Sequence, residues 1–546
     1  MQGLMQSQPL LISNIIEHAA RHHPDTEIVS RTVEGGIHRY TYLDAGKRAR
    51  KLANALVKSG VVLGDRVATL AWNGYRHFEL YYGISGIGAV MHTINPRLFP
   101  EQIAWIANHA EDKALFFDLT FLPLVEAIAS QLTTCKTFVL MTDRAHMPSL
   151  SKTESKLPNL LCYEELIAPE PDRFNWPQFD ENTASSLCYT SGTTGNPKGA
   201  LYSHRSTVLH AYGSAMPDTL NCSARDCILP VVPMFHVNSW GLAYLCPLVG
   251  AKMVLPGAQL DGKSVYELFE SEKVTMSAGV PTVWQGLLAH MKQHKLRFST
   301  LKGTVIGGSS CPPAMIKAFQ DDYGVKVLHA WGMTEMSPLG TVCNLKTKHL
   351  EWSQEQQFAV EVTQGRAVFG VDMKIVNDAG EELPWDGKAF GDLLVKGPWV
   401  VRGYYKGEGG DPLVDGWFPT GDVATISPDG YMQITDRSKD VIKSGGEWIG
   451  SIDLENVAMA HPAVAMAAAI AVPHPKWDER PLLVVVRKPG TEVTREALIE
   501  HYKGKVASWW VPDDVVFVDA IPIGATGKML KNQLREQFKD HRLPGV

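Results

Sequence analysis

The sequence predicts an α/β protein with a large N-terminal domain of parallel-rich sheets covered by helices, and a small α+β C-terminal domain. Three observations lead to this prediction. Helix-like and strand-like segments alternate through the first third of the chain, which is typical of a parallel sheet. A Gly- and Asp-rich region with short strands precedes residue 436. The chain has 546 residues, far more than a typical domain, so at least two domains are expected.

The N-terminal elements follow from the spacing of apolar residues. Thr41 and Asp44 indicate a helix start, and alanines and leucines then recur at helical spacing until Gly60 ends the helix. The other elements expected in this part are a helix near 76–88 and strands at 67–72, 114–117, 226–232, 252–255 and 304–306.

The chain changes character near residue 436. Before it, short strands are expected at 391–396, 424–426 and 431–435. After it, a compact unit should hold helices near 452–459 and from about 494, with strands near 464–472 and 482–487. We therefore expect domains at 1–435 and 441–546. The charged stretch 436–440 between them is a candidate hinge, although its spacing alone favours an ordinary exposed loop.

Composition narrows the functional class. With 45% hydrophobic and 20% charged residues, the chain is typical of a soluble globular protein. A net charge of −6 gives no reason to expect nucleic acid or anionic lipid as a partner. The eight cysteines form no CxxC pair, which favours reduced thiols in a cytoplasmic protein. The longest apolar run, 463–472, is about half the length that spans a bilayer, so no stable membrane anchor is expected.

The most informative stretch is 189–199, YTSGTTGNPKG. Its glycines let backbone N–H groups turn toward a ligand, its hydroxyls add donors and its lysine adds charge, as a phosphate cradle requires. A Ser- and Gly-rich surface turn is the alternative. Pro197 and Gly199 rule out a Walker P-loop. The residues expected to bind phosphate are Thr190, Ser191, Gly192, Thr193, Thr194, Gly195 and Lys198.

This stretch resembles the signature of the adenylate-forming enzymes, which include acyl-CoA synthetases, peptide-synthetase adenylation domains and firefly-type luciferases. Further segments match in the family's order over almost the whole chain: 307–309, 331–335, 420–422, 436–440 and 524–528. The stretch DRSKDVIKSGGEW at 436–448 is especially similar to medium- and long-chain fatty acyl-CoA synthetases.

The resemblance implies an ATP-dependent carboxylic acid–CoA ligase. Such an enzyme forms an acyl-AMP with release of pyrophosphate and then transfers the acyl group to coenzyme A. Lys528 would offset the repulsion between carboxylate and phosphate, and Glu335 with Thr190 would bind Mg²⁺. Without the resemblance, Lys528 would be interpreted as a solvated surface lysine and Glu335 as part of a helix start.

The resemblance also assigns the two substrate pockets. The expected AMP-binding residues are Gly308, His329, Ala330, Trp331, Thr334, Asp422, Arg437 and Lys443. His236 would lie beside the reacting carboxylate, and the expected acyl-binding residues are Val237, Trp240, Gly279 and Val280. Core packing competes as an account of Trp331 and Trp240, and a structural role competes for His236.

Several substrate readings stay open. Amino-acid-activating relatives carry an aspartate where this chain has His236, so an amino acid substrate is not expected, and the apolar tunnel residues favour an apolar tail. The chain also lacks the Ser-Lys-Leu ending of a peroxisomal luciferase. A medium-chain fatty acid fits best. The alternatives are a short thioether acid (3-methylmercaptopropionate), an aryl acid, or a nucleotide-binding module without ligase activity.

Motion and assembly are expected by analogy. In the family, the C-terminal domain rotates between the two half-reactions. Lys439 occupies the pivot position of the linker, and Trp448 belongs to the surface presented for thioester formation. The small domain is therefore expected to be mobile. The sequence leaves the oligomeric state open, and a homodimer is suggested only by analogy, because dimers are common among similar enzymes.

Overall fold

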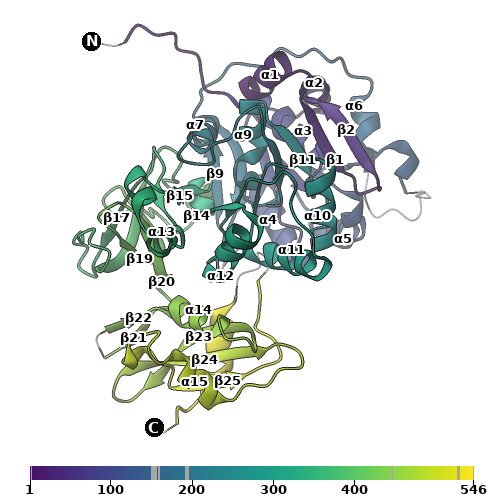
Figure 1. Cartoon of the computed structure of the whole chain (residues 1–546). Coiled ribbons are helices and arrows are strands. Elements are labelled where there is room, and N and C mark those ends of the chain that lie inside the picture. The colour runs from purple at the N-terminus through teal and green to yellow at the C-terminus, as the bar shows by residue number, and fades with distance from the viewer. Residues whose placement is uncertain are drawn as a thin grey trace.

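The computed structural model describes residues 1, 3–148, 157, 160–190, 196–445, 447–524 and 529–544, with the backbone alone at 447 and 448. A seven-stranded sheet has the order β7-β6-β5-β3-β4-β8-β9 (Figure 1). Its neighbours are parallel except β9, which runs antiparallel at one edge. The strands are β3 Arg66–Leu70, β4 Val90–Thr93, β5 Ala114–Phe117, β6 Thr137–Leu140, β7 Leu160–Cys162, β8 Ala184–Tyr189 and β9 Gly199–Ser203.

A nine-stranded sheet has the order β16-β15-β14-β13-β12-β10-β11-β1-β2. Its central strands are parallel, while β2 at one edge and β15 and β16 at the other are antiparallel to their neighbours. The strands are β1 Glu27–Arg31, β2 Ile37–Thr41, β10 Cys227–Pro230, β11 Lys252–Leu255, β12 Met276–Gly279, β13 Gly303–Ile306, β14 Lys326–Gly332, β15 Leu339–Val342 and β16 Arg366–Ala367.

Helices fill the space between these sheets and cover their outer faces (Figure 1). Every residue of α3, Tyr75–Gly86, is buried, and this helix contacts β1 of one sheet and β4 of the other. The remaining helices of this part are α1 Ile12–His22, α2 Tyr42–Lys58, α4 Pro100–Ala110, α5 Leu122–Ile128, α6 Tyr163–Ile167, α7 His204–Ala215, α8 Val237–Trp240, α9 Leu242–Val249, α10 Gly262–Ser271, α11 Pro281–His294, α12 Pro313–Lys317 and α13 Gln354–Glu361.

The structure confirms the helix start at Thr41 and two of the predicted strands. The Thr41 side chain accepts a hydrogen bond from the Asp44 N–H, and the Asp44 carboxylate accepts one from the Thr41 N–H, so the predicted helix start is a complete capping box. Strands β5 and β11 have the predicted bounds. All eight cysteines are buried free thiols. Within the described residues, no helix combines the length and apolar character needed to cross a bilayer.

Two smaller sheets follow. The first is antiparallel and holds β17 Asp372–Val376, β18 Phe390–Lys396, β19 Phe418–Ile426 and β20 Met432–Arg437. The predicted strand at 424–426 is only the end of β19, which therefore also carries Asp422. The second sheet holds β21 Ile442–Ser444, β22 Glu447–Ile449, β23 Val464–His474, β24 Asp478–Arg487 and β25 Asp514–Phe517, packed with α14 Ser451–Met459, α15 Arg495–Tyr502 and α16 Lys531–Gln537.

The stretch between these two sheets makes contacts with both of the units that it joins. Arg437 is the last residue of β20 and pairs with Asp422 of β19. Three residues later, Asp440 lies 2.6 Å from Arg535 of α16 in an ion pair. Figure 1 shows the last sheet set apart from the rest of the molecule, with α14 next to β20.

Candidate active site

The predicted phosphate loop connects two antiparallel strands. Tyr189 ends β8 and pairs with Gly199, the first residue of β9. The Thr190 N–H donates to the Lys198 carbonyl at 2.9 Å, and the Lys198 N–H donates to Thr190 Oγ1 at 3.2 Å. These two bonds close the base of the loop. The predicted residues at its centre, Ser191, Gly192, Thr193, Thr194 and Gly195, lie outside the described residues.

Glu335 lies on a short 3-10 turn that contacts β9. Tyr202 of β9 donates its hydroxyl hydrogen to the Thr334 carbonyl and so fixes the turn against this strand. Tyr404 donates a hydrogen bond to Glu335 Oε1 at 2.8 Å. The ammonium of Lys198 lies 4.9 Å from the centre of the Tyr404 ring. Tyr404 therefore brings the predicted phosphate-binding lysine and the predicted metal-binding carboxylate together.

The residues around Glu335 fit a nucleotide-bound magnesium ion. The Glu335 side chain is buried, and Thr190 supplies a hydroxyl at the base of the phosphate loop. In the part of the chain that the structure describes, no group of three or more side chains could hold a metal alone. Mg²⁺ commonly takes one or two carboxylates and completes its shell with phosphate and water oxygens. One carboxylate beside a phosphate loop meets that requirement.

Asp422 is oriented by two predicted partners. Trp331 Nε1–H donates to Asp422 Oδ2 at 2.9 Å, and Arg437 Nε lies 3.0 Å from Oδ1. The register of β19 and β20 brings Asp422 opposite Arg437, while Trp331 comes from β14. Both Trp331 and Asp422 are buried. The structure thus brings three predicted AMP-binding residues together. The Asp422 carboxylate among them is an acceptor suited to ribose hydroxyls.

The turn after His236 has an unusual backbone. All four residues of α8, Val237–Trp240, have positive φ angles of 46°, 53°, 55° and 54°. A left-handed turn costs roughly 1–2 kcal/mol per non-glycine residue. Buried hydrogen bonds hold it: Ser239 donates to the Val232 carbonyl at 2.9 Å, and the Asn238 amide donates to Ser186 Oγ of β8 at 2.9 Å. Such strain is found mainly at functional sites.

This turn forms one wall of a pocket beside the phosphate loop. Thr190 and His236 lie at the pocket together with Val237 of the turn. The other walls are mostly apolar or aromatic and include Ile94, Leu98, Ile106, Tyr189 and Phe235. Among its described lining residues there is no Asp, Glu, Lys or Arg. The structure therefore brings the predicted histidine, the predicted threonine and one predicted acyl-binding residue to a single apolar pocket.

Trp240 and Val280 meet at a different predicted residue. A Cβ atom on Gly308 would lie 3.2 Å from Val280 and 3.4 Å from Trp240, so both side chains pack against this glycine. The φ of Gly308 is +79°, which also favours glycine. Gly279 has a packing role, because a Cβ there would lie 2.5 Å from the Trp284 indole. Acyl contact by Gly279 stays a prediction.

Of the remaining predicted residues, His329 and Ala330 directly precede Trp331 on β14, and the others lie on the linker and in the C-terminal unit. His329 is buried and donates from Nδ1 to the Val362 carbonyl at 3.0 Å, and burial lowers its pKa to about 4, so its ring is neutral at pH 7. Ala330 is buried beside it on β14. Lys443 is exposed on β21, and burial lowers the pKa of Lys439. Lys528 and the Trp448 side chain lie outside the described residues.

Sequence reasoning missed Tyr404 and Asn238. Tyr404 lies in a segment without a recognised pattern, and its partner Glu335 is 69 residues away. Asn238 stands in an apolar segment, where its tolerance of positive φ was the only local signal.

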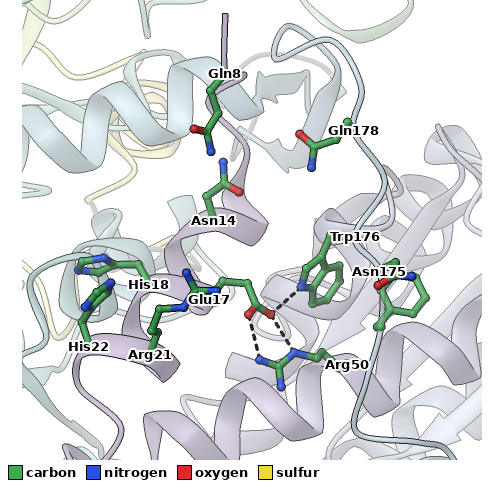
Figure 2. Close-up of a pocket in the computed structure, with 11 residues that line it drawn as sticks. Gln8, Asn14, Glu17, His18, Arg21, His22, Arg50, Asn175, Trp176 and Gln178 are labelled. Atoms are coloured by element: carbon green, nitrogen blue, oxygen red, sulfur yellow. Dashed lines mark hydrogen bonds and ion pairs between the residues drawn. The ribbon is translucent and has the colours of Figure 1, made fainter. Parts of the chain in front are cut away.

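A second pocket lies at α1, away from these residues (Figure 2). Glu17 accepts hydrogen bonds there from Arg50 at 2.8 Å and from the Trp176 indole at 2.7 Å. None of the predicted site residues lines this pocket.

Comparisons with known proteins give the family of the chain. The model of the AMP-binding enzyme family matches residues 16–405, and that of the AMP-binding enzyme C-terminal domain matches residues 453–528. A 3-methylmercaptopropionyl-CoA ligase from Ruegeria lacuscaerulensis is 55% identical, covering 99% of each chain. A medium-chain-fatty-acid–CoA ligase from Ectopseudomonas oleovorans is 52% identical, covering 99% of this chain and 98% of that one. The fold matches a crystal structure of an anthranilate CoA ligase with a TM-score of 0.83 at 24% identity, covering 98% of this chain and 99% of that one.

Proposed function

The chain belongs to the family of AMP-binding enzymes, and within it to the acyl-CoA ligases, and on that premise we propose that its acid has an apolar tail of short to medium length. ATP and coenzyme A are the co-substrates of such ligases. The carboxylate attacks the α-phosphate of ATP, pyrophosphate leaves, and the thiol of coenzyme A then displaces AMP from the acyl-AMP.

The pocket beside Thr190 and His236 carries this proposal. Its walls are mostly apolar or aromatic, with Thr93 and Asn95 as further polar residues, and no aspartate, glutamate, lysine or arginine side chain lines it among the described residues. Burying an unpaired polar or charged group there would cost several kcal/mol, roughly 2–7 for a polar group without a partner. The acid should therefore place its carboxylate near Thr190 and His236 and an uncharged tail against Ile94, Leu98 and Phe235.

The thioether acid is a second candidate, because similar enzymes carry its name and aromatic side chains line the pocket. 3-Methylmercaptopropionate is pentanoate with sulfur in place of one methylene, and relatives 55% and 54% identical carry its name. Tyr189 and Phe235 offer aromatic rings to that sulfur. A sulfur–aromatic contact contributes about 0.3–1.5 kcal/mol, or roughly 2- to 10-fold in selectivity. An apolar pocket discriminates only weakly by one methylene, so both acids should react.

The predicted site residues divide the adenylation step between them. Lys198 and the phosphate loop would hold the polyphosphate, and Asp422 with Arg437 would bind the ribose. A Mg²⁺ ion on Glu335 and Thr190 would neutralise phosphate charge. Lys528 would supply the cation between carboxylate and α-phosphate. His236 would orient the carboxylate.

Coupled AMP release across a panel of acids tests this proposal. The panel runs from acetate to palmitate, with 3-methylmercaptopropionate and benzoate included. We expect kcat/KM to peak between pentanoate and octanoate, with the thioether acid at or up to roughly tenfold above pentanoate. A clear optimum at palmitate or benzoate would overturn the substrate proposal. An enzyme that shows no acid-dependent exchange of pyrophosphate into ATP would instead be a nucleotide-binding module.

A further inference from the structure

The segment from Val401 to Gly409 holds the Glu335 turn from outside the predicted motifs. The Val401 N–H donates to the Glu335 carbonyl at 2.8 Å, and the Tyr404 hydroxyl donates to Glu335 Oε1, also at 2.8 Å. Backbone and carboxylate of the same residue are therefore fixed by one short segment. A hydrogen bond to a charged acceptor is among the stronger side-chain contacts in proteins.

The same segment contacts Lys198, the lysine of the phosphate loop. The Lys198 ammonium lies 4.9 Å from the Tyr404 ring centre, within cation–π range. A Cβ atom at Gly409 would lie only 2.8 Å from Lys198 Nζ, so the lysine head also packs against this glycine backbone. Lys198 thus contacts both Tyr404 and Gly409 at the end of the loop.

The other end of the loop meets the segment through a histidine. Glu408 Oε1 lies 3.1 Å from His109 Nε2, and His109 Nδ1 lies 2.6 Å from the hydroxyl of Tyr189. Tyr189 directly precedes Thr190 at the start of the loop. Both ends of the phosphate loop are therefore connected to the segment from Val401 to Gly409. Within that segment, Tyr404 contacts both Lys198 and Glu335.

We propose that Tyr404 is a positioning residue that sets Glu335 through its hydroxyl and Lys198 through its ring. This inference rests on the proposed function, because it assigns metal binding to Glu335 and phosphate binding to Lys198. The two contacts use different parts of one side chain, so two substitutions separate them. Tyr404→Phe removes the hydroxyl and keeps the ring. Tyr404→Leu removes both.

Two binding titrations form the test. Mn²⁺ is titrated by electron paramagnetic resonance in the presence of an ATP analogue with a methylene between the α- and β-phosphates. The affinity for the same analogue is measured again with EDTA. Tyr404→Phe should weaken Mn²⁺ binding roughly tenfold and leave the metal-free affinity within twofold of the original. Tyr404→Leu should also lower the metal-free affinity several-fold, because a cation–π contact is lost.

Tyr266→Phe is the matched control. Its hydroxyl also donates to an oxygen at 2.8 Å, the exposed Arg297 carbonyl, and neither residue is a predicted site residue. Tyr266→Phe should change neither the Mn²⁺ titration nor the metal-free affinity. Thermal unfolding of all three variants checks the fold, and the Tyr404 ring packs edge-on against Phe418 at 6.5 Å, a contact that phenylalanine keeps.

The outcomes distinguish this inference from the proposed function. Equal loss of Mn²⁺ and metal-free affinity in Tyr404→Phe would show that the hydroxyl does not act through Glu335. Unchanged affinities in both variants would remove Tyr404 from the site. Because neither titration contains an acid, an enzyme without acid-dependent pyrophosphate exchange fails the proposed function while the titrations still decide the role of Tyr404.

Discussion

At the scale of single residues, Asp422 shows how the site fixes a side chain through distant partners. Trp331 and Arg437 contact different oxygens of its carboxylate, at 2.9 and 3.0 Å. Contacts to both oxygens of a carboxylate set the plane of the group. The family motifs named all three residues. The contact between Trp331 and Asp422 spans 91 residues, however, and no local pattern could reveal it.

Lys528 carries the sharpest residue-scale prediction, although it lies outside the described residues. Lys528→Ala should remove the cation that offsets carboxylate–phosphate repulsion. We expect adenylation to slow by roughly 10²–10³, as when one oxyanion-hole donor is removed. Thioester formation from preformed acyl-AMP should be spared. Measuring the two half-reactions separately checks this, and an equal fall in both would contradict the assigned role.

At the scale of elements, periodicity predicted the regular parts and missed the left-handed turn. The buried strands β5 and β11 are short apolar runs with clear boundaries, so the sequence predicts them well. The turn Val237–Trp240 begins with a β-branched residue, which disfavours positive φ. Tertiary hydrogen bonds from Asn238 and Ser239 impose it, and these partners are known only once the strands are assembled.

The turn leads to a prediction about Asn238. Glycine accepts positive φ and alanine does not, so Asn238→Ala should destabilise the protein by roughly 1–2 kcal/mol more than Asn238→Gly. Both variants lose the hydrogen bond to Ser186, which should shift Val237 and raise KM for the acid more than KM for ATP. Chemical unfolding and steady-state kinetics check the two expectations.

Asn221 provides the control for this comparison. It has a φ of 51° but is exposed, and it does not line the pocket. Asn221→Ala should show the same backbone penalty relative to Asn221→Gly, with KM for the acid unchanged. If Asn238→Gly and Asn238→Ala prove equally stable, the turn is not strained in solution.

At the scale of the whole molecule, the linker divides its bonds between two units. Arg437 pairs with Asp422, and Ser438 donates to Asp392 Oδ1 at 2.6 Å, so these two residues hold the preceding sheet. Asp440 pairs instead with Arg535 of the C-terminal unit at 2.6 Å. Lys439 lies between these side-chain contacts, while the N–H groups of Asp440 and Val441 both donate to the Arg437 carbonyl across it. A pivot at Lys439 stays a prediction, which composition alone could not distinguish from an exposed loop.

The rotation predicted for the C-terminal unit can be tested at this residue. Lys439→Pro would fix φ near −65° and delete an N–H. Lys439 is absent from the residues with positive φ, so proline does not meet that obstacle in the present arrangement. If this arrangement serves adenylation, the variant should keep much of the acyl-AMP rate and lose most thioester formation, because the second step needs a different φ/ψ at the pivot. Rapid-quench measurement of acyl-AMP and acyl-CoA resolves the two steps.

The control is Glu492→Pro, which places a proline in an exposed loop of the same unit and reports the effect of proline on stability. Normal thioester formation by Lys439→Pro would mean that the pivot lies elsewhere or that the unit does not turn.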